Sequence, residues 1–313
     1  MKKKTKRLLI ILIPVAIVLI AAALYGLGLL GVLSPSAEKS DAQVIRMIGA
    51  QAIWQNRLED RIPQTAISDV MMRHMEQEGE PPRKLLFIVY DGALATAAGL
   101  RAEKNPEAPI GSLAAKGGAW LGFAGGAKPG DQSTSTSAGF AGMFTGVWAD
   151  RNGVAENSDT LSPETRTVMY RLHAQGKQAR FFFSWEPHMT VNNRLEAEEF
   201  PALYEYCGSD AGTFTAMLEG IEDGMDAVIG SLEYTDSAGH TTGFNLRSRY
   251  MNAIANAEND AMALIAAAEE RAETYGEDWL IVLGSDHGGT GYGHGGTSLA
   301  ESTTWFVANQ KIF

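Results

Sequence analysis

The chain has 313 residues, of which 45% are hydrophobic and 20% charged, which is typical of a globular protein with room for one sizeable α/β domain. Its single cysteine, Cys207, excludes an intramolecular disulfide and a metal centre built from thiolates, so any metal would need imidazole and carboxylate ligands. Five lysines and arginines lie within residues 2–7, so the formal net charge of −11 becomes −16 on the rest of the chain. Such an acidic body should repel nucleic acid, and we expect no nucleic-acid partner.

The N-terminal segment has the pattern of a membrane anchor. Residues 1–7 form a basic tail, and residues 8–33 carry no charge. A bilayer core needs about 20 apolar residues in a helix, whereas the apolar core of a cleaved signal peptide is only about 7–15 residues long. We therefore expect an uncleaved signal-anchor over residues 8–33, with processing near residues 34–37 as the alternative. Because basic residues stay in the cytoplasm, the pattern predicts a single-pass cell-membrane protein with an extracytoplasmic body.

Residues 34–83 are predicted to be a helical stalk or linker, or a docking layer on the main domain, because their apolar residues recur at helical spacing. The main domain is expected over residues 84–313. It begins with the continuous apolar run Leu85–Tyr90, which is typical of a central parallel strand covered on both faces. That run stops at Asp91-Gly92. Ligands gather at the carboxyl ends of strands in open α/β sheets, so Asp91 is a candidate ligand, although Asp-Gly is also ordinary turn chemistry.

A hydroxyl-rich loop over residues 131–139 follows a predicted helix at 109–116 and an apolar run at 119–123. Such loops are often solvated turns or helix caps. This one precedes the apolar residues 140–146 and therefore lies at a predicted helix start, where free backbone N–H groups and the helix dipole favour an anion. A hydroxyl at this position is well placed to bind a phosphate or to attack it.

Strands and helices alternate through the rest of the chain. We expect strands at 179–184, 227–232 and 279–284, with helices at 163–175, 212–220 and 245–275. His188 follows the first of these strands and is interpreted as a surface histidine, with a position lining the pocket as the alternative. The alternation predicts an α/β fold, a sandwich with a mostly parallel sheet.

Three of the predicted strands lead directly into carboxylates. Asp91 and Asp286 come immediately after their strands, and Asp236 follows its strand with His240 four residues later. The last loop, rich in glycine, adds His287 and His294. Glycine allows a backbone to bend tightly and approach a ligand closely. Acids and imidazoles delivered in this way to one edge of a sheet indicate a metal site.

These motifs resemble those of the alkaline phosphatase superfamily, and most of all its type I phosphodiesterase/nucleotide pyrophosphatase branch. The resemblance spans residues 84–309 and implies a three-layer α/β/α sandwich with two divalent metal ions, usually zinc. Imidazole and carboxylate ligands are also compatible with manganese and iron. Carried over by position, the resemblance implies one ion on Asp236, His240 and His294, and another on Asp91, Asp286 and His287. The nucleophile of the family lies ten residues before the glycine of a Thr-Gly pair, which is Thr145-Gly146 here, and this count designates Thr136.

The function that the resemblance implies is phosphoric ester hydrolysis. Thr136 would attack phosphorus while also binding the second metal, and water would then hydrolyse the phospho-threonine. Two metals suit this chemistry because one stabilises the attacking oxygen and the other the leaving oxygen. We expect the substrate to be a small phosphate ester or an envelope polymer.

Some residues depart from the family pattern. The diesterase branch usually has Asn three residues after its nucleophile, and this chain has Gly139, so a phosphomonoesterase remains open; a backbone N–H or the hydroxyls of Ser135 and Ser137 are possible substitutes. The chain lacks the Cys-x-Pro-x-Arg setting of sulfatases, and it has only about one helix between His240 and Asp286, which predicts an open pocket. Two further functions are compatible with the sequence: an envelope phosphoglycerol or phosphoethanolamine transferase, and an inactive, metal-stabilised surface binding module.

Overall fold

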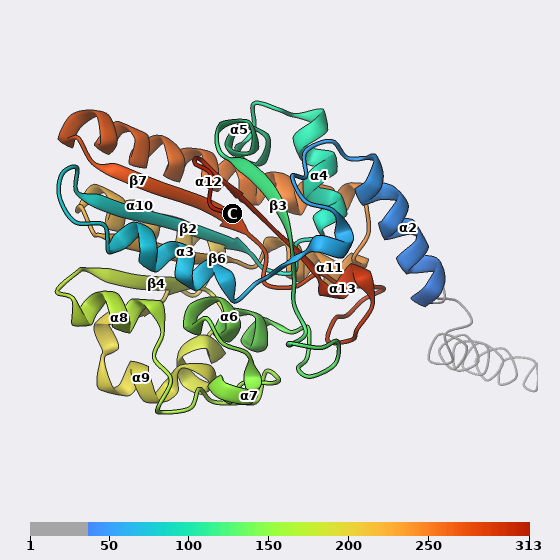
Figure 1. Ribbon diagram of the computed structural model, residues 1–313, viewed down its shortest axis with the longest axis horizontal. Coiled ribbons are helices and arrows are strands. Elements are labelled where there is room, and N and C mark those ends of the chain that lie inside the picture. Colours follow the sequence, from blue (N-terminus) through green and yellow to red (C-terminus); the bar gives the residue numbers. More distant parts are fainter. Residues whose placement is uncertain (1–36) are drawn as a thin grey trace, which may run out of the picture. The chain divides into compact units, whose positions relative to one another are not determined.

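Eight strands form one mixed sheet in the computed structural model, which describes residues 37–313 (Figure 1). The strands are β1 (Ile62–Pro63), β2 (Arg83–Tyr90), β3 (Gly118–Phe123), β4 (Ala179–Phe183), β5 (Tyr204–Tyr206), β6 (Ala227–Leu232), β7 (Asp278–Gly284) and β8 (Thr303–Ala308). Their order across the sheet is β1-β3-β8-β7-β2-β6-β4-β5.

Helices connect most of the strands. The α-helices are α2 (Ala37–Ala50), α3 (Ala66–Met75), α4 (Ala95–Lys104), α5 (Pro109–Lys116), α6 (Thr136–Thr145), α7 (Ala149–Asn152), α8 (Val168–Ala174), α9 (Arg194–Glu199), α10 (Asp210–Glu222), α11 (Tyr234–Thr242), α12 (Ser248–Tyr275) and α13 (Leu299–Ser302). Two short 3-10 helices, η1 (Leu58–Asp60) and η3 (Pro201–Leu203), and one π-helix, η2 (His188–Asn192), complete the set.

The direction of β8 makes the sheet mixed. β8 runs antiparallel to both of its neighbours, β3 and β7, whereas the pairings of β2 with β6, β2 with β7 and β4 with β6 are parallel. The α/β class expected from the sequence is therefore confirmed, and the sheet contains one reversed strand.

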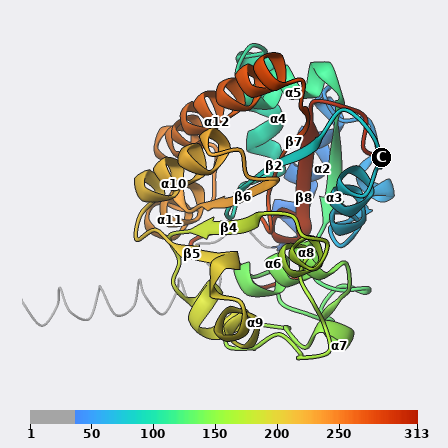
Figure 2. The same ribbon diagram turned by 90° about the vertical axis from the view of Figure 1, so that its left-hand side faces the viewer.

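Helices cover both faces of the sheet, as Figure 2 shows. Leu86, Ile88 and Tyr90 of β2 belong to a core shared with α4, α5, α10 and α12, and the alternate residues of β2 belong to a second core shared with α3, α6 and α8. Side chains of a strand alternate between faces, so a strand buried on both faces must be apolar throughout. Burying such a side chain contributes about 1.5–3 kcal/mol, which explains why the continuous apolar run of β2 occupies the middle of the sheet.

Residues 62–75 join this fold directly. β1 pairs with β3, and Ile67, Val70 and Met71 of α3 are buried in the second core. Residues Val44–Phe313 form one compact unit. Within the segment 34–83, β1 therefore extends the sheet, and α3 packs on one of its faces.

The predicted basic tail and signal-anchor, residues 1–33, lie outside the described residues. Among the helices that the structure describes, none has the combined length and apolarity needed to cross a membrane.

Several helices differ in extent from those predicted. The helix expected over residues 163–175 begins at Val168, because the side chain of Thr167 accepts a hydrogen bond from the Tyr170 N–H and caps it there. Residues 234–242, for which no helix was predicted, fold as α11. The helix expected over 245–275 is α12, which ends at Gly276 in a left-handed conformation.

Candidate metal centre

The parallel strands β6, β2 and β7 are neighbours, so their carboxyl ends meet at one edge of the sheet. Asp91 follows β2, Asp286 follows β7, and Asp236 lies in the first turn of α11, just after β6. Three carboxylates that are far apart in the sequence are therefore delivered to one place.

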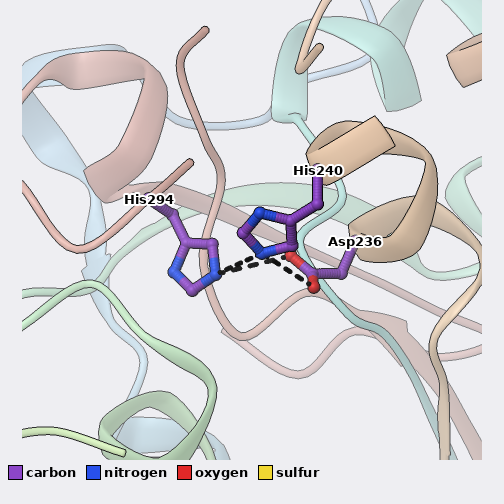
Figure 3. A group of neighbouring side chains, drawn as sticks. All are labelled: Asp236, His240 and His294. Carbon is purple, nitrogen blue, oxygen red and sulfur yellow. Dashed lines mark hydrogen bonds and ion pairs between the residues drawn. The ribbon is translucent and has the colours of Figure 1, made fainter. Parts of the chain in front are cut away.

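Asp236, His240 and His294 form a first group, and their side chains point toward one another (Figure 3). Nε2 of His240 lies 3.3 Å from Oδ2 of Asp236, and Nε2 of His294 lies 3.5 Å from its Oδ1. The two Nε2 atoms are 3.2 Å apart. Asp236 and His240 are one helical turn apart on α11, so both project from the same face of that helix.

Asp91, Asp286 and His287 form a second group, which is completely buried. Nε2 of His287 lies 3.4 Å from Oδ1 of Asp91 and 3.3 Å from Oδ2 of Asp286. The hydroxyl of Thr136 is 3.3 Å from the same nitrogen. The rings of His287 and His294 stack with centroids 3.9 Å apart, so the two groups form one continuous centre.

Backbone carbonyls orient all three imidazoles. The Nδ1 atoms of His240, His287 and His294 lie 2.9, 2.7 and 3.1 Å from the carbonyl oxygens of Tyr292, Gly288 and Thr134, respectively. A carbonyl only accepts, so each Nδ1 must carry a proton, which leaves Nε2 as the nitrogen whose lone pair can face the centre. This is the arrangement in which histidines bind metals.

The inward-facing atoms of the centre are therefore nearly all acceptors. Both carboxylate oxygens of Asp91, Oδ1 of Asp236 and Oδ2 of Asp286 are buried without a hydrogen-bond partner. Lone pairs facing one another at these distances repel unless protons or cations lie between them. Carboxylate and imidazole are suitable ligands for zinc, manganese and iron, so the residues fit two divalent cations.

The electrostatics of the second group and of His294, which stacks on it, lead to the same conclusion. Burial, followed by the neighbouring Asp286 carboxylate, raises the pKa of Asp91 well above its usual range. Burial also raises the pKa of Asp286, against the effect of the Gly92 N–H that donates to it. Burial lowers the pKa of His287, and it lowers the pKa of His294 to about 4, with His287 adding to that shift. The carboxylates thus need positive charge to stay ionised, and the imidazoles are neutral, as metal binding requires.

Thr136 is the first residue of α6, so its hydroxyl lies at the helix end where backbone N–H groups lack intrahelical acceptors. The neighbouring hydroxyl of Ser135 is buried without a hydrogen-bond partner, whereas that of Ser137 lies 3.5 Å from the carbonyl oxygen of Asn157. The Asn157 side chain accepts a hydrogen bond from the Ser137 N–H at 2.9 Å. Among the described residues, its Nδ2 donates to no protein acceptor, so it remains free to bind an anion.

Gly139 also lies in α6, and its backbone packs directly on Asp286. A side chain at this position would overlap the loop that carries three of the candidate ligands, Asp286, His287 and His294. The glycine is therefore explained by the close approach of α6 to the centre.

Two features of the centre escaped the sequence interpretation. Phe244 follows α11; its N–H donates to Gly291 at 2.7 Å, and its ring contacts His240 and His294, so it joins the two segments of the first group. The hydroxyl of Tyr250 donates to the carbonyl of Gly92 at 2.6 Å and accepts from the Leu94 N–H at 3.0 Å. No local pattern distinguishes these aromatic residues from ordinary core residues.

His188 is not the surface histidine that was expected. It is completely buried, and neither ring nitrogen has a hydrogen-bond partner. It packs among aromatic rings of β4 and α6, because the chain turns inward at η2.

The similarity of the chain to known proteins is one of structure rather than of sequence. No protein-family model and no curated protein sequence matches the chain. Its structure is similar to that of BT1596, a 2-O GAG sulfatase, with a TM-score of 0.50 and 12% identity over 74% of this chain and 64% of that one. It is also similar to murine ectonucleotide pyrophosphatase/phosphodiesterase 5 (TM-score 0.47, 19% identity, 66% and 58% of the two chains). The periplasmic domain of phosphoethanolamine transferase EptC from Campylobacter jejuni has a TM-score of 0.49 with 14% identity over 72% and 80%.

The likeness to the sulfatase shows that the chain shares its fold, which is the alkaline phosphatase-like fold that the motifs predicted. At these identities the likeness shows the fold alone. The chain also spans only 58% of the length of the murine protein.

Proposed function

We propose that the chain is a metal-dependent phosphoric ester hydrolase with Thr136 as its nucleophile. The observation that carries this proposal is the position of the Thr136 hydroxyl, at the N-terminus of α6 and 3.3 Å from His287, beside two groups of carboxylate and imidazole ligands. A hydroxyl, an anion-binding helix end and a two-cation centre together are what phosphoryl transfer requires.

Each group has a distinct role in the proposal. Asp236, His240 and His294 would hold one divalent cation, and Asp91, Asp286 and His287 another, with Thr136 as a further ligand of the second. When bound, the cations would lower the pKa of a coordinated hydroxyl or water and neutralise charge on the phosphoryl group. Zinc is the proposed metal, with manganese as the alternative.

Residues at the start of α6 and beside it would position the phosphoryl group. The oxygens of that group would accept hydrogen bonds from backbone N–H groups at the helix start, from the Ser135 hydroxyl and from Nδ2 of Asn157. These donors leave Oγ1 of Thr136 directed at phosphorus. A bond forms between Oγ1 and phosphorus while the bond to the ester oxygen breaks, and the departing alcohol gains the threonine proton. Water then cleaves the phospho-threonine, releasing phosphate or a phosphate monoester and restoring the hydroxyl.

The accessibility of the first group suits an acceptor that arrives from solvent. The side chain of His240 is 46% exposed, whereas Asp91 and His287 are completely buried. Water can therefore reach the centre from the side of His240. An acceptor alcohol could arrive in the same way, and for this reason we keep a phosphoryl-polymer transferase as the second candidate.

A direct comparison of substrates tests the proposal. The full-length chain, loaded with zinc or with manganese, would be assayed on an aryl phosphate diester, an aryl phosphate monoester and an aryl sulfate, each with and without glycerol as an acceptor. We expect release of the aryl alcohol from at least one phosphate ester and none from the sulfate. Transfer to glycerol in preference to water would favour the transferase. No reaction of metal-loaded protein with any of these esters would reject the hydrolase and favour a binding module.

We also propose that this chemistry takes place outside the cytoplasm, on a chain anchored by residues 8–33. The support is the basic tail followed by an uncharged apolar segment. Protease treatment of intact cells should digest a tag fused after Phe313 and spare one fused before Met1. The reverse pattern would contradict this location.

A further inference from the structure

We propose that Asp91, His188 and Glu233 form a third cation site, next to the candidate metal centre and sharing Asp91 with it. The proposal does not depend on hydrolase activity. Ligand atoms of these three residues, one from each, all lie within 4.8 Å of one another. Asp91 follows β2, Glu233 follows β6, and His188 lies shortly after β4, so neighbouring parallel strands deliver all three to the same edge of the sheet.

His188 is the strongest indication that something binds here. The residue is completely buried, and both ring nitrogens lack a hydrogen-bond partner. A neutral imidazole has one donor and one acceptor, and burying either without a partner is unfavourable. A ligand at this position would remove that cost.

The surroundings of His188 hold its ring in place without satisfying it. The centroids of Phe140, Phe181, Phe183 and Trp185 lie 4.5, 5.0, 5.4 and 5.0 Å from its own, all in edge-to-face geometry. Aromatic rings offer an N–H only a weak contact and offer a nitrogen lone pair nothing comparable to a hydrogen bond. The carboxylates of Asp91 and Glu233 each place an oxygen within 4.8 Å of a ring nitrogen of His188.

The carboxylates are also positioned for a ligand. One oxygen of Glu233 accepts the Ser231 hydroxyl at 3.0 Å, and the Glu233 N–H donates to Asp210 at 2.7 Å, so the side chain is held at both ends. Both oxygens of Asp91 are buried without a hydrogen-bond partner, which allows one residue to serve two neighbouring cations. In the part of the chain that the structure describes, no lysine or arginine forms an ion pair with Asp91 or Glu233.

A cation satisfies this group better than a water molecule does. Water could accept from or donate to His188 and donate to one carboxylate, but it carries no charge that would keep the two buried carboxylates ionised. A divalent cation neutralises both and takes the imidazole lone pair. Two carboxylates and one imidazole suit zinc, manganese or iron rather than calcium or magnesium.

Metal stoichiometry tests the proposal on the full-length chain. The protein would be equilibrated separately with zinc chloride and manganese chloride, freed of excess metal and analysed by inductively coupled plasma mass spectrometry. We expect His188→Phe and Glu233→Gln each to bind one equivalent fewer than the wild type with at least one of these metals. The control is His173→Phe on the exposed face of α8, which makes the same substitution and should lose no metal. Circular dichroism establishes that each variant is folded, and Glu233→Gln serves as the second probe if His188→Phe is not.

The outcomes separate this proposal from the proposed function. Anomalous diffraction at the metal edge should show a peak among Asp91, His188 and Glu233 in addition to any at the first two groups. Equal metal content in wild type and both variants, or electron density for water alone at this position, would overturn the third site whether or not the protein hydrolyses esters. A full complement of cations without hydrolysis would reject the hydrolase and leave the third site intact.

Discussion

A Cβ atom added to Gly139 would lie 2.8 Å from the backbone carbonyl oxygen of Asp286. Atoms of this kind do not approach so closely, so either α6 or the ligand loop would have to move. We expect Gly139→Ala to destabilise the protein by about 1–3 kcal/mol and to lower both metal content and turnover. Urea denaturation and metal analysis would measure these effects.

The control for this change lies in the same helix. At Gly142 the nearest atom to an added Cβ is Nε2 of the Gln64 side chain, at 3.3 Å, which can shift. Alanine is favoured over glycine in helices by about 1 kcal/mol, so Gly142→Ala should be neutral or stabilising. Equal behaviour of the two variants would show that α6 does not pack on the centre as described.

Thr136→Ala removes the proposed nucleophile and little else. Turnover should fall by roughly a thousandfold or more, while the cations, each held by three other residues, should remain bound. Thr136→Ser keeps the hydroxyl and should retain part of the activity. Steady-state kinetics with parallel metal analysis would measure both, and normal turnover of the alanine variant would reject the assignment.

Phe244→Ala should loosen the first group without removing any of its three candidate ligands. The ring is buried and contacts both His240 and His294, and removing a buried phenylalanine side chain costs about 3–5 kcal/mol. We expect a loss of stability in this range together with weaker metal binding at the first group. Phe244→Leu keeps more of the side-chain volume, so its stability and metal affinity should lie between those of the wild type and Phe244→Ala. Unchanged metal affinity in both variants would show that the ring has no positioning role.

Stability should decrease as the pH falls, in part because of His74. Burial lowers the pKa of this residue from 6.5 to about 4, and its Nε2 lies 3.0 Å from the carbonyl oxygen of Lys84. Between these two values the unfolded chain binds more protons than the folded one, so protonation favours unfolding by at most about 1.4 kcal/mol per pH unit. His74→Gln removes this contribution. Its unfolding free energy, measured from pH 7 to pH 4, should therefore depend less on pH than that of the wild type, and parallel curves would contradict the prediction.

Removing the metals should lower the melting temperature. Each cation present at a hundred times its Kd adds about 2.7 kcal/mol, which for two cations in a chain of this size corresponds to roughly 10 °C. Differential scanning calorimetry with a chelator, followed by addition of zinc, would show the loss and its recovery. A melting temperature that does not respond to chelation of a metal-loaded sample would argue against cations in the centre.

The carboxyl edge of the sheet was predictable because its signals are local. A continuous apolar run marks a strand buried on both faces, and β2, β6 and β7 each show such a run just before a candidate carboxylate. Parallel neighbours then bring their ends together with no further information. The convergence of Asp91, Asp236 and Asp286 follows from this rule.

Other features depend on contacts that leave no local signal. Strand direction is not encoded in the apolar pattern of Thr303–Ala308, so the antiparallel placement of β8 could not be read from it. The helix α11 is polar and contains Gly239, with little amphipathic character to distinguish it from a loop. The burial of His188 depends on Phe140, which is 48 positions away in the chain. Long-range packing decided each of these.

The position of β8 in the sheet has a consequence for biosynthesis. Among the described strands, β1 and β3 join the rest of the sheet through β8, although β8 is the last strand to be synthesised. The two parts of the sheet therefore stay unlinked until residues 303–308 have been synthesised and can pair. Until then the apolar edge strands on either side of the gap are open to chaperones and to pairing with other nascent chains, so final assembly must follow translation of these residues rather than accompany it.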